Sequence, residues 1–366
     1  MDLAKHDAAN GWVAFTAGLY DGDHDLYLVR EGQDARRIVG SDTDKRHQRC
    51  PAFSPDGGRL AYGEAERLDD ESGFSGAVLV IAALDPEGNL SGSREIPLEV
   101  PLGGIDGPPC PLWSPDGVRI ALGVSDAIGR PLLDGDVWIV DSESGQQELF
   151  PGLWVAGDGS YSDMEWSPDG AELAIAGKQI SLYEPFTGQM RVLSGDYETM
   201  ASASDRWMSW SPNGETIAYQ YGGEIRLIDV EDVSERVLAT DPDPSHGIGP
   251  VWSPDGKLIV YQRTCCGNGE DVIIKSPAGE EVVLPHRLFP GLSANEWFPF
   301  RVTWSPDGRQ LLYLGWSGRG FMTALIAVPI ASNSQPVLLH AHRQIAVYES
   351  GYQLGFQTWG RETSPP

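Results

Sequence analysis

The apolar residues of this chain fall in short segments in which apolar and polar positions alternate, and turn-forming residues separate the segments. A period of two predicts β-strands, and helical spacing does not persist over a useful length. The clearest segments resemble Arg-Leu-Ala-Tyr at residues 59–62. Equivalent segments occupy residues 119–122, 172–175, 216–219, 258–261 and 310–313. Two further strand-like segments follow each of them, so the pattern predicts an all-β protein.

An aromatic residue and the tetrapeptide Ser-Pro-Asp-Gly precede each of these segments, with Asn in place of Asp in one copy. Proline presets the first corner of a type I turn, Asp or Asn fits the second, and Gly supplies a left-handed residue. The aromatics are 60, 53, 44, 42 and 52 residues apart. Repeats at this period indicate propeller blades or solenoid units. The aromatics are Phe53, Trp113, Trp166, Trp210, Trp252 and Trp304, and the turn glycines are residues 57, 117, 170, 214, 256 and 308.

The two ends of the chain complement each other. Residues 12–15, 25–29 and 36–39 match the last three strands of a repeat, and residues 352–360, with Trp359, match its missing first strand. Pairing of these ends would close a ring and remove exposed sheet edges. We therefore expect a single β-propeller domain over residues 1–366, with seven four-stranded blades. A six-bladed ring with an irregular terminal sheet is the alternative.

The turn, the strand after it, and pieces such as Asp25-Leu26-Tyr27-Leu28-Val29 resemble the TolB-type, WD-like β-propeller repeat. The resemblance extends from about residue 10 to residue 360. It implies the fold, with the Ser-Pro-Asp-Gly turns on one face. Propellers of this type serve as periplasmic interaction scaffolds, as lid domains of prolyl-oligopeptidase-like peptidases, and occasionally as enzymes. The TolB protein has six blades and a further N-terminal domain, so orthology with TolB does not follow.

The chain has 26 basic and 53 acidic residues, a formal charge of -27. Such a surface repels phosphate backbones, which argues against a nucleic-acid partner. No apolar stretch approaches the length of a membrane span, so membrane insertion is not expected. The first residues lack a signal peptide, although a removed export segment would leave a similar start. We expect a monomer in the periplasm or outside the cell.

Four cysteines are too few for a disulfide framework in a chain of this length. Cys50 and Cys110 each lie three residues before a repeat aromatic, so they occupy equivalent places in consecutive repeats. Equivalent positions in neighbouring blades are usually too far apart for a bond. Two buried thiols are therefore favoured over a disulfide.

Variable loops lie opposite the turns, and propeller ligands usually bind where such loops converge over the central channel. Cationic and aromatic residues near this position fit a carboxylate-bearing peptide or sugar, because Arg makes forked hydrogen bonds and Trp stacks. Each of them, taken alone, is better explained by pairing with nearby acids and by loop packing. The candidate ligand-binding residues are Arg46, His47, Arg49, Tyr161, Asp163, Arg206, Trp207, His246, Trp297 and Arg301.

No catalytic signature is complete. Residues 315–318 (Gly-Trp-Ser-Gly) lack the final Gly of a nucleophile elbow, because residue 319 is Arg. His340 and His342 form at most a metal half-site, and the acidic segments 21–25 and 241–243 lack the full calcium-loop spacing. We therefore expect a non-catalytic scaffold, without metal or cofactor, that binds a protein, peptide or glycan at its loop face. A propeller enzyme acting on a saccharide as a lyase or hydrolase, with or without a metal, is the alternative.

Overall fold

The protein is presented as a computed structural model. The structure describes residues 10–18, 24–30, 32–40, 46–68, 74–98, 109–124, 134–155, 163–176, 179–194, 208–221, 223–240, 249–265, 269–284, 297–317, 322–330, 337–343 and 358–361. It forms two compact units, one made of Ala8–Tyr161 with Ile345–Pro366 and the other of Met1–Asp7 with Ser162–Gln344. Each unit is described by itself.

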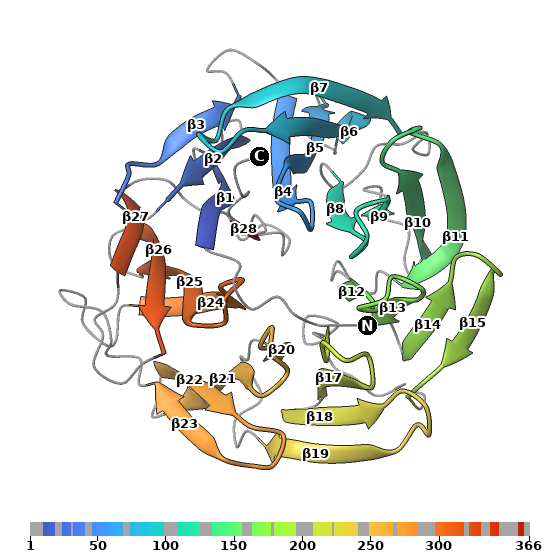
Figure 1. Ribbon diagram of the computed structural model, residues 1–366, viewed down its shortest axis with the longest axis vertical. Coiled ribbons are helices and arrows are strands. Elements are labelled where there is room, and N and C mark those ends of the chain that lie inside the picture. The colour runs from blue at the N-terminus through green and yellow to red at the C-terminus, as the bar shows by residue number, and fades with distance from the viewer. Residues whose placement is uncertain are drawn as a thin grey trace. The chain divides into compact units, whose positions relative to one another are not determined.

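The first unit, Ala8–Tyr161 with Ile345–Pro366, holds three four-stranded sheets among its described residues (Figure 1). One sheet has the order β28-β1-β2-β3, with β28 Thr358–Arg361, β1 Asn10–Gly18, β2 His24–Val29 and β3 Arg36–Val39. The next consists of β4 Arg46–Phe53, β5 Arg59–Arg67, β6 Phe74–Leu84 and β7 Leu90–Pro97. The third consists of β8 Cys110–Trp113, β9 Arg119–Val124, β10 Asp134–Asp141 and β11 Gln147–Val155.

The second unit, Met1–Asp7 with Ser162–Gln344, holds four sheets among its described residues. The first two are β12 Asp163–Trp166, β13 Leu173–Ala176, β14 Ile180–Glu184 and β15 Gln189–Val192, then β16 Met208–Trp210, β17 Thr216–Tyr221, β18 Glu224–Asp229 and β19 Glu235–Thr240. The last two are β20 Val251–Trp252, β21 Ile259–Cys265, β22 Gly269–Lys275 and β23 Glu281–Leu284, then β24 Trp297–Trp304, β25 Gln310–Ser317, β26 Met322–Pro329 and β27 Val337–Arg343.

All paired strands run antiparallel, and each sheet follows the chain from one strand to the next. The one exception in chain order is β28, which pairs with β1 through Val13↔Trp359 and Ala14↔Thr358. The predicted all-β fold of four-stranded sheets is therefore confirmed. Residues 352–357 of the predicted closing strand lie outside the described residues. Closure of one ring, the blade number and the single domain stay predictions.

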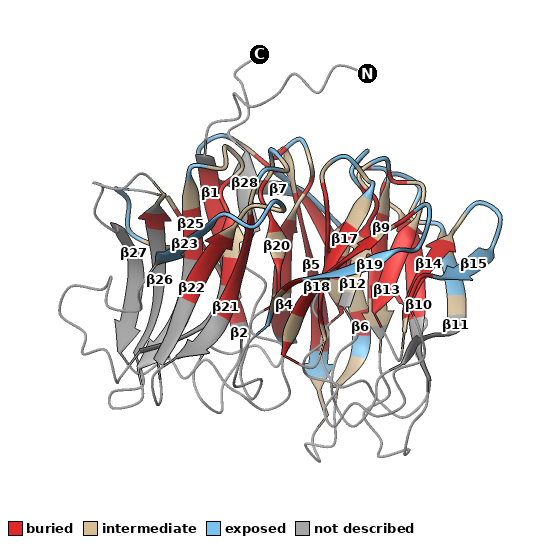
Figure 2. Ribbon diagram, turned by 90° about the horizontal axis from the view of Figure 1, so that it is seen from below, coloured by how far each residue is buried: buried red, intermediate tan, exposed pale blue. Residues whose placement is uncertain are grey.

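Within each unit, neighbouring sheets meet along their first strands: β28 contacts β4 and β4 contacts β8, whereas β12, β16, β20 and β24 contact one another in succession. The apolar residues of the middle strands fill the space between the sheets. In the sheet of β12–β15, all four residues of β13 are buried and all four of β15 are exposed (Figure 2). Burial thus decreases toward the outermost strand, as expected where sheets converge along their first strands.

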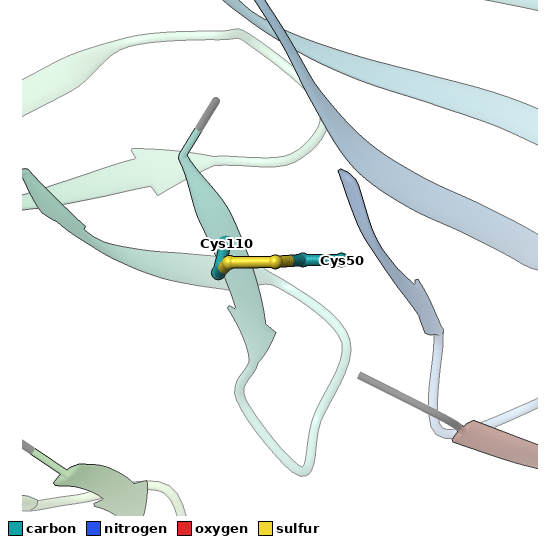
Figure 3. The surroundings of a disulfide bond; sticks show 2 residues. All are labelled: Cys50 and Cys110. Atoms are coloured by element: carbon teal, nitrogen blue, oxygen red, sulfur yellow. A yellow bond between two sulfur atoms is a disulfide. The ribbon is translucent and has the colours of Figure 1, made fainter. Parts of the chain in front are cut away.

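Cys50 and Cys110 are joined by a disulfide with 5.0 Å between their Cα atoms, so the expectation of two thiols is wrong (Figure 3). Cys50 lies on β4 and Cys110 begins β8. These are the first strands of neighbouring sheets, which contact each other. The spacing estimate failed because it considered blades as a whole, whereas their separation is smallest at the first strands.

Candidate functional site

The six described sheets that carry the turn have two ends that differ in character. We call the end that carries the Ser-Pro-Asp/Asn-Gly turn the turn end, and the opposite end the loop end. In the sheet of β4–β7, the Ser54 hydroxyl donates to Asp56 Oδ1 at 2.5 Å and accepts from the Arg59 amide at 2.9 Å. Asp56 Oδ1 also accepts from the Gly58 amide at 3.1 Å. Gly57 has a φ of 75°, a left-handed conformation that favours glycine.

The same hydrogen bonds recur in the other five copies of the turn, including the copy in which Asn213 replaces Asp. The hydrogen bonds from the Ser167 hydroxyl and the Ala171 amide hold the pKa of Asp169 below its ordinary value. The serine hydroxyl and one side-chain oxygen of the Asp or Asn are therefore engaged in shaping each turn.

Two of the repeat aromatics, Trp113 and Trp304, are hydrogen-bonded to a neighbouring sheet near the turn end. Trp113 Nε1 donates to the Ala52 carbonyl of the preceding sheet at 3.0 Å. The Arg59 guanidinium lies 4.7 Å from the centre of the Trp113 ring and donates to the Gly117 carbonyl at 2.9 Å. Trp304 Nε1 makes the equivalent bond to the Val251 carbonyl, at 3.0 Å. These aromatics have the structural role that the sequence predicted.

The loop end of the β4–β7 sheet carries a buried polar network. Register pairs Gln48 on β4 with Glu64 on β5, so the two side chains share a face. Arg46 Nη1 donates to Glu64 Oε1 at 2.6 Å, and Gln48 Nε2 donates to Glu64 Oε2 at 3.3 Å. Glu64 is only 8% exposed, whereas the Arg46 side chain is about half exposed at 49%. Arg46 therefore reaches from a buried carboxylate toward the surface.

The neighbouring side chains gather around a phenyl ring. The His47 ring meets the Phe74 ring edge-on, with 5.1 Å between their centres, and the Arg49 guanidinium lies 5.9 Å from the same ring. His47 is buried. Burial, together with the positive charges of Arg49 and Arg67, lowers the pKa of His47 to about 4. At neutral pH the imidazole is therefore uncharged.

This arrangement concentrates cationic and aromatic groups within a strongly acidic chain. Arg46 and Arg49 lie on opposite faces of β4, since Arg46 shares its face with Gln48 and Glu64, and each guanidinium has donors with the geometry that carboxylates accept. The neutral imidazole is buried against the phenyl ring, which offers a flat apolar surface. The set suits recognition of an anionic group attached to an apolar or ring-shaped body. We call Arg46, His47, Arg49, Arg67 and Phe74 the β4 cluster.

The other predicted site residues that the structure describes belong to the second unit. Asp163 and Trp297 begin β12 and β24, and Arg301 lies within β24 opposite Leu314. They thus occupy first strands, as Arg46 does on β4, but in the other unit. Tyr161, Arg206, Trp207 and His246 lie outside the described residues. Convergence of all ten residues over one channel stays a prediction.

Four participants were not predicted from the sequence: Gln48, Glu64, Arg67 and Phe74. The alternation alone does not reveal the first two. Regular pairing outward from the turn would place residue 49 opposite residue 64, and the register shift between Arg49 and Ala52 brings Gln48 opposite Glu64 instead. The contacts of Arg67 and Phe74 depend on a register shift between Glu64 and Glu66, which the alternation does not reveal.

Other site classes have little support among the residues described here. No group of three or more His, Cys, Asp or Glu side chains in these ranges is arranged to hold a metal ion. His340 and His342 lie on β27, and the expected absence of a metal stays a prediction. No helix in the described part of the chain has the length and apolar character needed to span a bilayer.

Comparison with known proteins adds similarities of fold. No family model matches the chain. The uncharacterized peptidase YuxL of Bacillus subtilis is 26% identical over 211 residues, which cover 56% of this chain and 28% of that protein. The chain thus matches less than a third of the length of this curated relative.

Among solved structures, a putative 6-phosphogluconolactonase from Bacteroides uniformis is similar over 92% of this chain and 98% of its own, with a TM-score of 0.56 and 16% identity. The match with TolB from Acinetobacter baumannii covers 76% of this chain and 64% of the TolB chain, with a TM-score of 0.45 and 18% identity. The match with Kuenenia stuttgartiensis hydrazine synthase covers 82% of this chain and 80% of the synthase chain, with a TM-score of 0.49 and 18% identity. The likeness to the Bacteroides protein concerns the fold alone. The sheets and turns of the chain itself confirm its resemblance to the TolB-type β-propeller repeat.

Proposed function

We propose that this chain is a non-catalytic binding scaffold, a single propeller domain of seven blades closed by β28. Its loop end presents a recognition surface to a protein, peptide or glycan. The observation that carries the proposal is the β4 cluster: His47 and Arg49 meet Phe74 at the loop end of one sheet, whereas at the turn end the serine hydroxyl and one Asp oxygen bond within the turn. The four-stranded sheets and the pairing of β28 with β1 support the closed ring.

Charge indicates the chemistry of the ligand. The chain carries a formal charge of -27, so an anionic ligand would be repelled by most of the surface. At the β4 cluster, Arg49 and Arg67 provide a local exception, whereas the charge of Arg46 is paired with Glu64. A carboxylate bound there would gain forked hydrogen bonds, and an attached ring or apolar side chain would pack on Phe74. The ligand class that fits is a peptide or acidic sugar with a free carboxylate.

The Cys50–Cys110 disulfide supports a location in the periplasm or outside the cell, because disulfides persist in oxidising compartments. The proposed protein acts there as a monomer. Mass spectrometry of the native protein, purified with free thiols blocked, tests the location. Recovery of both cysteines in the blocked, reduced form would contradict it.

The binding proposal is tested on peptide and acidic-oligosaccharide arrays with three forms of the protein. The first is the unchanged chain, the second is Arg46→Ala/Arg49→Ala, and the third is Lys257→Ala/Arg309→Ala. The third form removes the same charge from the turn end, where Lys257 is 78% exposed. We expect the second form to lose binding by at least about tenfold and the third to keep it. Equal binding by all three would contradict the proposal.

One observation favours a second candidate. The similarity to a protein named as a peptidase is consistent with a propeller that serves a peptidase, as lid domains of this repeat type do. Turnover of peptide anilides by the purified chain would support a peptidase. Turnover of acidic polysaccharides, with metal analysis of the same sample, tests the saccharide enzyme. Any turnover that tracks the protein through purification would overturn the non-catalytic assignment.

A further inference from the structure

The strand that carries the β4 cluster is interrupted at its middle. Arg49 pairs with Gly63, but the next pair joins Ala52 to Ala61, so Cys50 and Pro51 together face a single residue of β5. This is a β-bulge, which bends a strand and unpairs part of its ladder. The bulge divides β4 into a loop-end half, residues 46–49, and a turn-end half, residues 52–53. The β4 cluster draws its strand residues from the loop-end half.

Cys50 holds an unfavourable backbone conformation at this bulge. Its φ is 56°, one of two positive values among the described non-glycine residues. A cysteine in this left-handed region is destabilised by its Cβ and persists only where surrounding structure imposes it. The disulfide to Cys110 is the covalent constraint at that residue. Breaking the bond would therefore remove a restraint from a strained hinge.

A close backbone approach lies beside the disulfide. A Cβ added to Gly63 would lie 1.8 Å from the carbonyl oxygen of Pro109, the residue before Cys110. The strand β5 and the start of β8 therefore touch at the level of the bulge. On the turn side of the bulge, by contrast, the sheets are held without the disulfide, by the Trp113–Ala52 hydrogen bond and a buried core that includes Ala61 and Ile120.

We propose that the Cys50–Cys110 disulfide is a redox-sensitive latch that fixes the loop-end half of β4. With the bond formed, residues 46–49 are held in the register that aligns the β4 cluster. With the bond open, Cys50 relaxes from its left-handed conformation, the bulge rearranges, and the half-strand detaches from β5. The turn-end half stays in place. The latch concerns the conformation of the chain, and it holds whether or not a ligand binds there.

The opening step requires a dithiol reductant. One thiolate of the dithiol attacks the half-buried Cys110 sulfur and displaces Cys50 as a thiolate, and the second thiolate then releases Cys110. The dithiol gives up two electrons and becomes a disulfide, while the two cysteines end as thiols after taking up two protons. Cys50 is fully buried, so attack at Cys110 is the accessible route.

Hydrogen exchange on the full chain, oxidised and reduced, tests the latch. We expect the amides of residues 46–49 and their partners 63–66 to lose protection by about tenfold or more on reduction. Amides of residues 114–119 at the turn end should change less than about twofold. Cys265→Ser, treated in the same way, is the control for reduction elsewhere. Unchanged protection at 46–49, or equal loss in every sheet, would overturn the proposal.

Two variants without the disulfide separate strain from simple loss of a crosslink. Cys50→Gly/Cys110→Ser places at residue 50 a glycine, which tolerates positive φ, whereas Cys50→Ala/Cys110→Ser places there an alanine, which does not. We expect the glycine variant to retain more protection at 46–49 than the alanine variant, although glycine ordinarily weakens strands. Equal protection in the two variants would contradict the proposal that Cys50 acts as a strained hinge, because backbone strain at residue 50 would then have no role.

Discussion

The two ends of the β4–β7 sheet carry similar kinds of residue and use them differently. At the turn end, Ser54 and Asp56 bond to each other and to the next backbone amides, a local set of contacts spanning six residues. At the loop end, Arg46 reaches Glu64 and His47 reaches Phe74, contacts that span 18 and 27 residues of chain. The local set recurs in every copy of the turn. The non-local contacts lie at the loop end, outside the repeated turn motif. We therefore search for function at the loop end.

The largest expected effect concerns the joint between sheets at the turn end. Trp113→Ala would remove a buried ring, its hydrogen bond to Ala52 and its contact with Arg59. We expect a loss of about 3–5 kcal/mol in the free energy of unfolding, measured by urea denaturation. Trp113→Phe, which keeps most of the apolar volume, should lose much less. Similar values for the two variants would mean that the ring does not fill the joint.

A smaller effect should follow within the turn itself. Ser54→Ala removes the acceptor of the Arg59 amide and the donor to Asp56, so we expect about 1–3 kcal/mol of destabilisation. Asp56→Asn is the matched control, because Asn213 makes the same turn in another copy. It should cost under about 0.5 kcal/mol. A larger cost for Asp56→Asn than for Ser54→Ala would show that charge, rather than hydrogen bonding, shapes the turn.

Titrating groups at the loop end and at the turn end should lose their contributions to stability in different pH ranges. Because the pKa of His47 is lowered to about 4, the unfolded chain binds more protons than the folded one between about pH 6.5 and pH 4. The stability that the neutral imidazole contributes is therefore complete above pH 6.5 and is lost as pH falls toward 4. The turn carboxylate of Asp169, whose pKa is lowered from 3.8, loses its contribution only at lower pH.

His47→Gln removes this titration from the loop end and tests that assignment. Between pH 7 and pH 4, the free energy of unfolding from urea titrations should fall less steeply for the variant. The difference in slope should correspond to up to about one proton taken up on unfolding. Asp169→Asn should leave the slope in this window unchanged. A variant slope equal to that of the unchanged chain would place the titration at another group.

The smallest effect on stability is expected at the surface of the β4 cluster. The Arg46 side chain is about half exposed, so Arg46→Ala should cost only about 0.5–1 kcal/mol although its partner Glu64 is buried. Glu64→Gln keeps the shape and offers an acceptor to Arg46. The loss in the double variant should be smaller than the sum of the two single losses, because both losses come from one pair. Fully additive losses in that double-mutant cycle would show that the ion pair is not formed.

The fold was largely predictable because its information is local. Pro55, Asp56 and Gly57 favour the turn through their own backbone preferences, and the following strand is legible from its alternation. Two thiols were expected instead of the Cys50–Cys110 disulfide, because the distance between these residues depends on how two sheets converge, which neither segment encodes alone. For the same reason, Arg46, His47 and Arg49 could be nominated from residue type, but the contacts of His47 and Arg49 with Phe74 depend on a register shift between β5 and β6.

The central claim is that this protein binds its ligand at the loop end and uses the turn end as scaffold. The most direct measurement is a hydrogen-exchange footprint of the chain with a carboxylate-bearing peptide or acidic oligosaccharide that the arrays select. The account predicts added protection at residues 46–49 and 64–67, and none at the turns at 54–59, 114–119 and 211–216. Protection at those turns, with residues 46–49 unchanged, would contradict it.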